Sequence, residues 1–231
     1  MNIVQRTIMH WRLRGFWKRE KARIPELQKA IDTIKREHQR ASDANLEHFA
    51  QFYNVVLFIL VMDYDVSVLS QYYVKAYTRY WEKKFVARQM AVLLYEASED
   101  IPQLLGGDFR ASLKTIPLWN EAEKELNKIS KELNRFKRSH SEMLKELRNF
   151  VTAHRDHNTV KQMDIIDNLN PDKIYALLGD FYDIMNTLAL FMIRIVRVMG
   201  NKSVIQRWTP SLGQDRGNIK VGFRYPQGVW C

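Results

Sequence analysis

The chain has 231 residues, 46% of them hydrophobic, so it can bury a substantial core in one large domain or two small ones, which excludes disorder of the whole. Its one cysteine is the terminal Cys231, which excludes an intrachain disulfide, and no residue spacing suggests a structural zinc site. The net charge is +10. The lack of disulfides fits a reducing compartment, and we expect a cytoplasmic protein.

The basic excess lies at the two ends of the chain. Residues 1–23 contain seven Lys or Arg against Glu20, and residues 194–231 contain seven against Asp215, so the middle carries a net charge of −2. Such ends can meet phosphate or acidic lipid, or they can be solvated segments without a specific ligand. The first segment is either an interfacial membrane helix or a basic cap that packs its tryptophans on the helical body.

Neither a secretory signal nor a membrane span is expected. The first residues mix apolar positions with Arg6, Arg12 and Arg14 instead of forming an apolar core. The longest apolar runs, 55–62 and 188–193, are shorter than the ~20 residues that a spanning helix needs. We interpret both runs as buried helix segments.

Helical periodicity, divided by glycine and proline, continues along most of the chain. The first half predicts a helix over 26–40 that opens at Pro25, a helix from Ser42-Asp43 to about 63–65, and a helical stretch over 66–101 that ends at Pro102 and Gly106-Gly107. The second half predicts a long helix over 118–157 after Pro117, a loop over 158–170, and a last helix from Asn170-Pro171-Asp172 to Gly200.

Three segments follow from this order. Residues 1–23 form a basic N-terminal segment, residues 24–200 form the helical domain, and residues 201–231 form a C-terminal arm that is irregular or extended. Within the arm, residues 219–225 alternate apolar and polar positions as a short strand does. We therefore expect an all-α fold, an antiparallel bundle of long helices with a short C-terminal arm.

The long helix over 118–157 has an apolar position at every third or fourth residue. These positions recur over more than four heptads, which predicts the seam of an antiparallel hairpin or of a subunit pair. They are Leu126, Ile129, Leu133, Phe136, His140, Met143, Leu147, Phe150 and His154. Each histidine of this stripe is either a core histidine satisfied by a hydrogen bond or a functional group that faces a partner helix.

Arg148 precedes His154 by six residues near the end of this helix. An imidazole exchanges protons near pH 7, and a guanidinium neutralises charge that builds on phosphoryl oxygens. The pair therefore suits chemistry on a phosphodiester and needs no metal or cofactor. Arg88 and Glu96 lie on one predicted helix, and either is a surface residue or reaches the motif from a neighbouring helix.

The run from Leu147 to Asp156, Leu-Arg-Asn-Phe-Val-Thr-Ala-His-Arg-Asp, resembles the signature of the HEPN superfamily. That signature is an arginine followed by a polar residue and, four to six positions after the arginine, a histidine. The closer likeness is to the Arg-Asn-x-x-x-Ala-His-x-Asp form of HEPN-like proteins from bacterial abortive-infection systems. The helical order over 26–200 is similar to that of the family.

The resemblance implies a helical bundle that dimerises so that two copies of the motif meet in one cleft and cleave RNA without metal. Arg148 would then stabilise the phosphoryl charge, His154 would be the general acid or base, and Asn149 would orient one of them or touch the RNA. Asp156 would support His154 or Arg148. Arg155 and His157 match no required position and are candidates for phosphate contacts only.

Two functions of different classes follow. The first is a metal-independent endoribonuclease of the HEPN type, a homodimer with a role in phage defence or as a toxin, for which RNA and an antitoxin or activating partner are the candidate partners. The second is a non-catalytic helical dimerisation or interaction protein, in which Arg148 and His154 form a structural polar contact.

Overall fold

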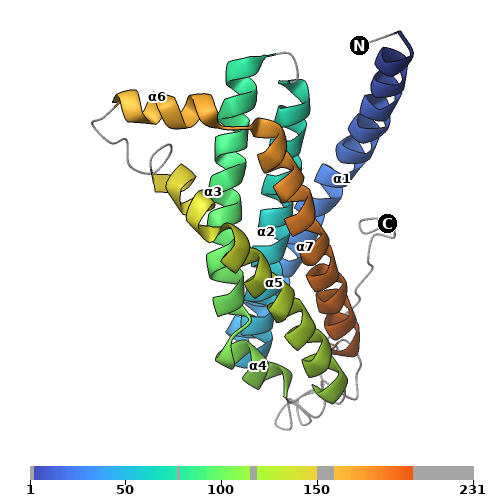
Figure 1. Cartoon of the computed structure of the whole chain (residues 1–231). Helices are drawn as coiled ribbons and strands as arrows, with labels where there is room; N and C mark the ends of the chain where they lie inside the picture. Colours follow the sequence, from blue (N-terminus) through green and yellow to red (C-terminus); the bar gives the residue numbers. More distant parts are fainter. Residues whose placement is uncertain (1–2, 77–78, 115–118, 150–158, 200–231) are drawn as a thin grey trace, which may run out of the picture.

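The computed structural model describes residues 3–76, 79–114, 119–149 and 159–199, and within these ranges the chain is all-α, with no strand (Figure 1). Long helices pack along one another as a bundle, and the N-terminal part of α1 diverges from it. The described helices are α1 (Ile3–Asp43), α2 (Glu47–Lys75), α3 (Tyr80–Leu104), α4 (Gly107–Leu113), α5 (Trp119–Arg148), α6 (Thr159–Asn168) and α7 (Pro171–Met199). The predicted fold class is confirmed, whereas the predicted strand over 219–225 lies outside the described residues.

Helix α5 has the apolar stripe that its sequence predicts, and the stripe is buried within one chain. Leu126, Ile129, Leu133, Phe136 and Leu147 are buried, while the other side of the helix is charged and exposed. The stripe packs against α3 and α7, and α5 runs back along α3 in the opposite direction (Figure 1). Of the two alternatives for this seam, the antiparallel packing of helices inside the chain therefore accounts for its apolar residues.

Helices α1 and α2 form the most extensive helix pair, but α1 begins earlier than predicted. It starts at Ile3 and contains Pro25, so the prediction that Pro25 opens the helix was wrong. A tight turn then joins the two helices near the predicted start of the second. Asn45 has a φ of 54°, a left-handed conformation that asparagine tolerates better than most residues, and the Leu46 N–H donates to the Ala41 carbonyl oxygen over 2.8 Å.

The predicted end of the second helix near 63–65 was also wrong, because α2 continues to Lys75. Asp63 is buried in the middle of this helix and accepts a hydrogen bond from the Arg23 guanidinium of α1. Asp63, which suggested a helix end in the sequence, is thus an internal residue of α2 with a cationic partner on the neighbouring helix.

The predicted loop over 158–170 contains a helix, α6. Lys84 of α3 is only 1% exposed, and its Nζ donates to the carbonyl oxygens of Ile166 at 2.6 Å and Asp167 at 2.7 Å. Carbonyls at a helix C-terminus lack partners inside the helix and carry partial negative charge, so a lysine there stabilises the helix end. This buried cation holds the end of α6 on α3.

The start of α7 agrees with its predicted signal. The Asn170 side-chain oxygen accepts hydrogen bonds from the backbone N–H groups of Asp172 and Lys173, as an N-cap residue does. The Asp172 carboxylate accepts from the Tyr73 hydroxyl at 2.7 Å and from Lys83 Nζ at 2.8 Å. These two hydrogen bonds lower the pKa of Asp172. The beginning of α7 is therefore tied to both α2 and α3.

Among the described helices, two are long and apolar enough to cross a membrane by length and composition, α2 and the stretch Pro171–Val198 of α7. The expectation of no such helix rested on uninterrupted apolar runs, which are shorter than these helices. About half of the most apolar stretch in each helix is buried inside the structure, 56% and 44% respectively. The core helices of soluble proteins share this length and composition.

Replacing Leu133 by alanine should lower the free energy of unfolding by about 2–5 kcal/mol, because the side chain is fully buried on the α5 stripe and its loss leaves a cavity. Chemical denaturation measures the change. Lys131→Ala, at an exposed position of the same helix, is the matched control and should change stability by less than about 0.5 kcal/mol. Equal effects of the two substitutions would contradict the buried stripe.

Asp172→Asn should destabilise the protein near neutral pH and lose this effect in acid. A carboxyl whose folded-state pKa is lowered contributes stability that is present above its unfolded pKa of about 4 and is lost as the pH falls through the lower folded value. Urea denaturation of both proteins between pH 2 and 7 measures the difference in unfolding free energy. A difference that grows as the pH falls would refute this account.

Candidate functional site

The predicted motif begins at the end of α5 and is partly described. Arg148 is the last residue of α5, and Asn149 follows it directly. His154, Arg155, Asp156 and His157 lie outside the described residues. The structure therefore places the arginine half of the motif, and the position of the histidine half stays a prediction.

Arg148 is held at the helix end by two residues of α3. Its Nε donates to Glu96 Oε1 at 2.7 Å, and its guanidinium carbon lies 5.5 Å from the centre of the Tyr95 ring. Its Nη1 also donates to the side-chain oxygen of Asn149 at 3.3 Å. The side chains of Arg148 and Glu96 are 33% and 43% exposed, so the ion pair is at the protein surface with solvent on one side.

Glu96 and Asn149 engage two of the three guanidinium nitrogens of Arg148, Nε and Nη1, whereas Nη2 makes no hydrogen bond within the described part of the chain. A guanidinium is planar and its donors have fixed directions, so holding Nε and Nη1 also sets the direction of Nη2. The side chain is one-third exposed, and Nη2 is a donor that can bind a phosphoryl oxygen.

A cavity of about 470 Å³ lies beside this helix end. It is lined by Glu146 and Leu147, the two residues before Arg148, and by residues of α6 and the start of α7, including Lys161, Asp164 and Lys173. The wall thus includes both helix ends that residues 150–158 join in the sequence. Charges of both signs line this cavity, so its walls offer donors and acceptors next to the motif.

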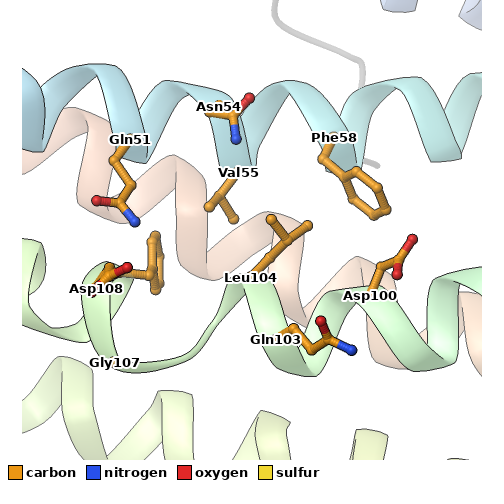
Figure 2. A pocket seen from close by; sticks show the side chains of 10 residues that line it. Gln51, Asn54, Val55, Phe58, Asp100, Gln103, Leu104, Gly107 and Asp108 are labelled. Atoms are coloured by element: carbon orange, nitrogen blue, oxygen red, sulfur yellow. The ribbon is translucent and has the colours of Figure 1, made fainter.

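A second cavity, of about 440 Å³, lies between α2 on one side and α3 with α4 on the other (Figure 2). Gln51 and Asp108 approach each other across one end, and Asp100 lies at the other end (Figure 2). Asp100 follows Glu96 by four residues, which is about one helical turn along α3. None of the residues that line this cavity belongs to α5 or to the predicted site.

Of the two α3 residues that contact Arg148, Glu96 was a candidate in the sequence analysis and Tyr95 was not. Glu96 was weighed with Arg88 as a residue that could reach the motif, and Glu96 does so. Arg88 lies 5.4 Å from the centre of the Phe85 ring on its own helix. Tyr95 was not singled out, since a tyrosine at helical spacing carries no signal that separates a core ring from a cation contact.

The other histidine of the predicted stripe, His140, lies against the core. Its ring is 4.9 Å from that of Phe136, and its side chain is half-buried. No three His, Cys, Asp or Glu side chains within the described ranges come together as metal ligands would. The described part of the site thus consists of one cation, its acidic partner, an amide and an aromatic ring.

No protein-family model, no curated protein and no solved structure matches the chain.

A second ion pair between the same helices provides a reference for the first. Lys137 Nζ of α5 lies 2.7 Å from Glu99 Oε2 of α3, and their side chains are 34% and 30% exposed. Double-mutant cycles to alanine should give a coupling energy of about 0.2–1 kcal/mol for each pair, because solvent screens both. A coupling energy several times larger for Arg148 and Glu96 than for Lys137 and Glu99 would show that solvent does not screen the Arg148–Glu96 pair.

Proposed function

We propose that the chain is a metal-independent endoribonuclease of the HEPN type, in which two copies of the chain form a composite site, with a role in phage defence or as a toxin. The observation that carries the proposal is the set of contacts that hold Arg148 at the end of α5. It ends α5, its Nε and Nη1 are bonded to Glu96 and Asn149, and its side chain is one-third exposed at a helix end that also lines a cavity. The local resemblance of residues 147–156 to the HEPN signature is the second support.

The proposed reaction needs only groups that the motif carries. The 2′-oxygen of the ribose attacks the adjacent phosphorus, the new P–O2′ bond forms, and the P–O5′ bond breaks. At the composite site, His154 of one copy takes the proton of the 2′-hydroxyl, His154 of the other copy gives a proton to the leaving 5′-oxygen, and Arg148 stabilises the charge on the phosphoryl oxygens. The products are a 2′,3′-cyclic phosphate and a 5′-hydroxyl. DNA lacks the 2′-hydroxyl and is therefore not a substrate.

The partners of Arg148 fit this role. A guanidinium that stabilises developing charge must be positioned before the reaction, and the bond from Nε to Glu96 provides that position. Asn149 is adjacent and can orient the arginine or contact RNA. In the same proposal Asp156 supports His154, and Arg155 and His157 supply phosphate contacts.

The second candidate function is a non-catalytic helical dimerisation or interaction protein. The observation that favours it is the likeness of the two ion pairs between α5 and α3. Lys137 with Glu99 and Arg148 with Glu96 have the same 2.7 Å separation and similar exposure. Because the lysine pair is not part of any motif, the arginine pair can equally be a structural tie between the two helices.

An RNA cleavage assay in excess EDTA separates the two functions. Wild type should cleave RNA and leave 2′,3′-cyclic phosphate ends, and Arg148→Ala and His154→Ala should each lower the rate by roughly 100-fold or more. Lys137→Ala is the matched control, since it removes an ion pair between the same helices without touching the motif. A substrate with 2′-deoxyribose at every position should stay intact.

Four outcomes would contradict the proposed nuclease or its composite site. Cleavage that survives both motif substitutions would remove the site assignment, and equal loss in Lys137→Ala would mean that the ion pairs act through folding. No cleavage of any RNA, with circular dichroism showing folded protein, would favour the interaction protein. The composite site also requires a dimer of twice 27.5 kDa, which sedimentation equilibrium measures. A strictly monomeric chain would exclude that site.

A further inference from the structure

One face of α3 is accessible to solvent along the part of the helix that precedes the contact with Arg148. Its five members lie within about 80° of one another around the helix axis, since each residue turns the helix by about 100°. We call this set the α3 face: Trp81, Phe85, Arg88, Val92 and Tyr95. Trp81 and Phe85 are exposed and the other three are half-buried, whereas every buried residue of α3 lies outside this arc.

Helix α5 does not extend along this part of α3. It runs antiparallel to α3, and its last residue, Arg148, contacts Glu96 and the ring of Tyr95 (Figure 1). Trp81 precedes Tyr95 by fourteen residues, which is about 21 Å along the helix axis. The α3 face therefore begins at the candidate site and leads away from it.

The end of the α3 face that is distant from Arg148 is aromatic. Trp81 is 56% exposed and Phe85 52%, and the neighbouring Tyr80, whose ring centre lies 5.9 Å from that of Trp81, is 60% exposed. No other large apolar side chain is exposed on the described length of α3. Nucleobases stack on exposed aromatic rings, and such stacking tolerates any sequence because every base has a π-face.

Positive charge surrounds these rings. Residues 75–88 contain five Lys or Arg against one Glu. Two acidic residues of other helices, Asp167 and Asp172, lie within 4.0 Å of lysines of this segment, so positive charge remains in excess. Within the α3 face itself, the Arg88 guanidinium carbon lies 5.4 Å from the centre of the Phe85 ring. Cations beside stacking rings attract the phosphates that connect the bases.

We propose that the α3 face binds a single-stranded segment of nucleic acid, with bases stacked on Trp81 and Phe85 and the phosphates drawn to the surrounding cations. That the bound strand continues to Arg148 rests on the proposed nuclease, whereas the stacking itself does not. The distance of about 21 Å from Trp81 to Tyr95 accommodates about six nucleotides at about 3.4 Å for each stacked base. Because stacking does not read the sugar, a DNA strand binds here without being cleaved.

A lipid surface and a second copy of the chain fit the α3 face less well. A helix that lies in a membrane interface inserts aliphatic side chains such as leucine together with its aromatic ones, and the described α3 exposes no large aliphatic side chain. Two copies that met through this face would bring like positive charges together. A single strand, by contrast, supplies both the rings and the negative charge that complement the face.

Fluorescence anisotropy with labelled DNA strands tests the proposal without cleavage of the probe. A dodecamer of thymidylate should bind, and its duplex with a dodecamer of deoxyadenylate should bind roughly tenfold or more weakly, because a duplex keeps its bases inside the double helix. A trimer of thymidylate should also bind roughly tenfold or more weakly, since it is shorter than the face. No binding of the single-stranded dodecamer, or equal binding of the duplex, would overturn the proposal.

Variants then locate the binding. Trp81→Ala and Phe85→Ala should each weaken binding of the thymidylate dodecamer roughly fivefold or more, whereas Trp81→Phe keeps a ring and should stay within about twofold of wild type. Leu190→Ala is the matched control, because it removes a side chain of α7 that is 42% exposed and lies outside the α3 face. Circular dichroism checks that each variant is folded. Full affinity in both alanine variants of the face would overturn the proposal.

RNA cleavage by the same variants separates this surface from the nuclease. Binding that depends on Trp81 in a wild type that cleaves no RNA would support the α3 face and contradict the nuclease. Cleavage with unchanged rate and unchanged affinity in Trp81→Ala would support the nuclease and overturn the α3 face. Vesicles of phosphatidylcholine and phosphatidylserine test the lipid alternative, and binding to them that needs Trp81, without binding of the dodecamer, would also overturn the proposal.

Discussion

Burial of the apolar face of α5 against α3 and α7 is the constraint on which the rest of the structure depends. Most of the stability of an amphipathic helix in a protein comes from packing its apolar face, so α5, with thirty residues, needs a surface that covers its stripe. Once Leu126, Leu133 and Leu147 are buried, the rotation of α5 is fixed. Lys137 and Arg148 then lie at the edge that faces the acidic residues of α3. The position of the candidate site is thus a consequence of core packing.

Two cations between the helices are held by partners of different kinds. Lys84 donates to two carbonyl oxygens at the end of α6, with the Asp167 carboxylate 4.0 Å away, and Arg23 is paired with the Asp63 carboxylate. Each joins helices that are far apart in the sequence. Lys84 also has a consequence for the motif. Residues 150–158 connect α5 to α6, so Glu96 holds the residue two positions before this segment, and Lys84 holds the helix that follows it.

The fold class, the apolar stripe of α5 and the start of α7 were predictable, because each depends on signals within a few neighbouring residues. The errors fell where a distant residue decides the outcome. α2 passes through Asp63 because Arg23 lies beside it, and α6 is a helix whose end is held by Lys84 of α3. The candidate site shows the same contrast between local sequence signals and distant contacts. Arg148 was predictable from its motif, whereas its contact with Glu96 depends on the packing of α3 on α5.

The geometry of Arg148 reconciles a structural tie with a chemical role. Lysine carries a single ammonium group, so Lys137 uses its charge in the contact with Glu99. A guanidinium spreads its charge over three nitrogens in one plane. Arg148 therefore holds Glu96 through Nε, while Nη2 makes no hydrogen bond within the described residues. The structural contact fixes the direction of Nη2, and loss of Glu96 would leave the positive charge in place but remove its orientation.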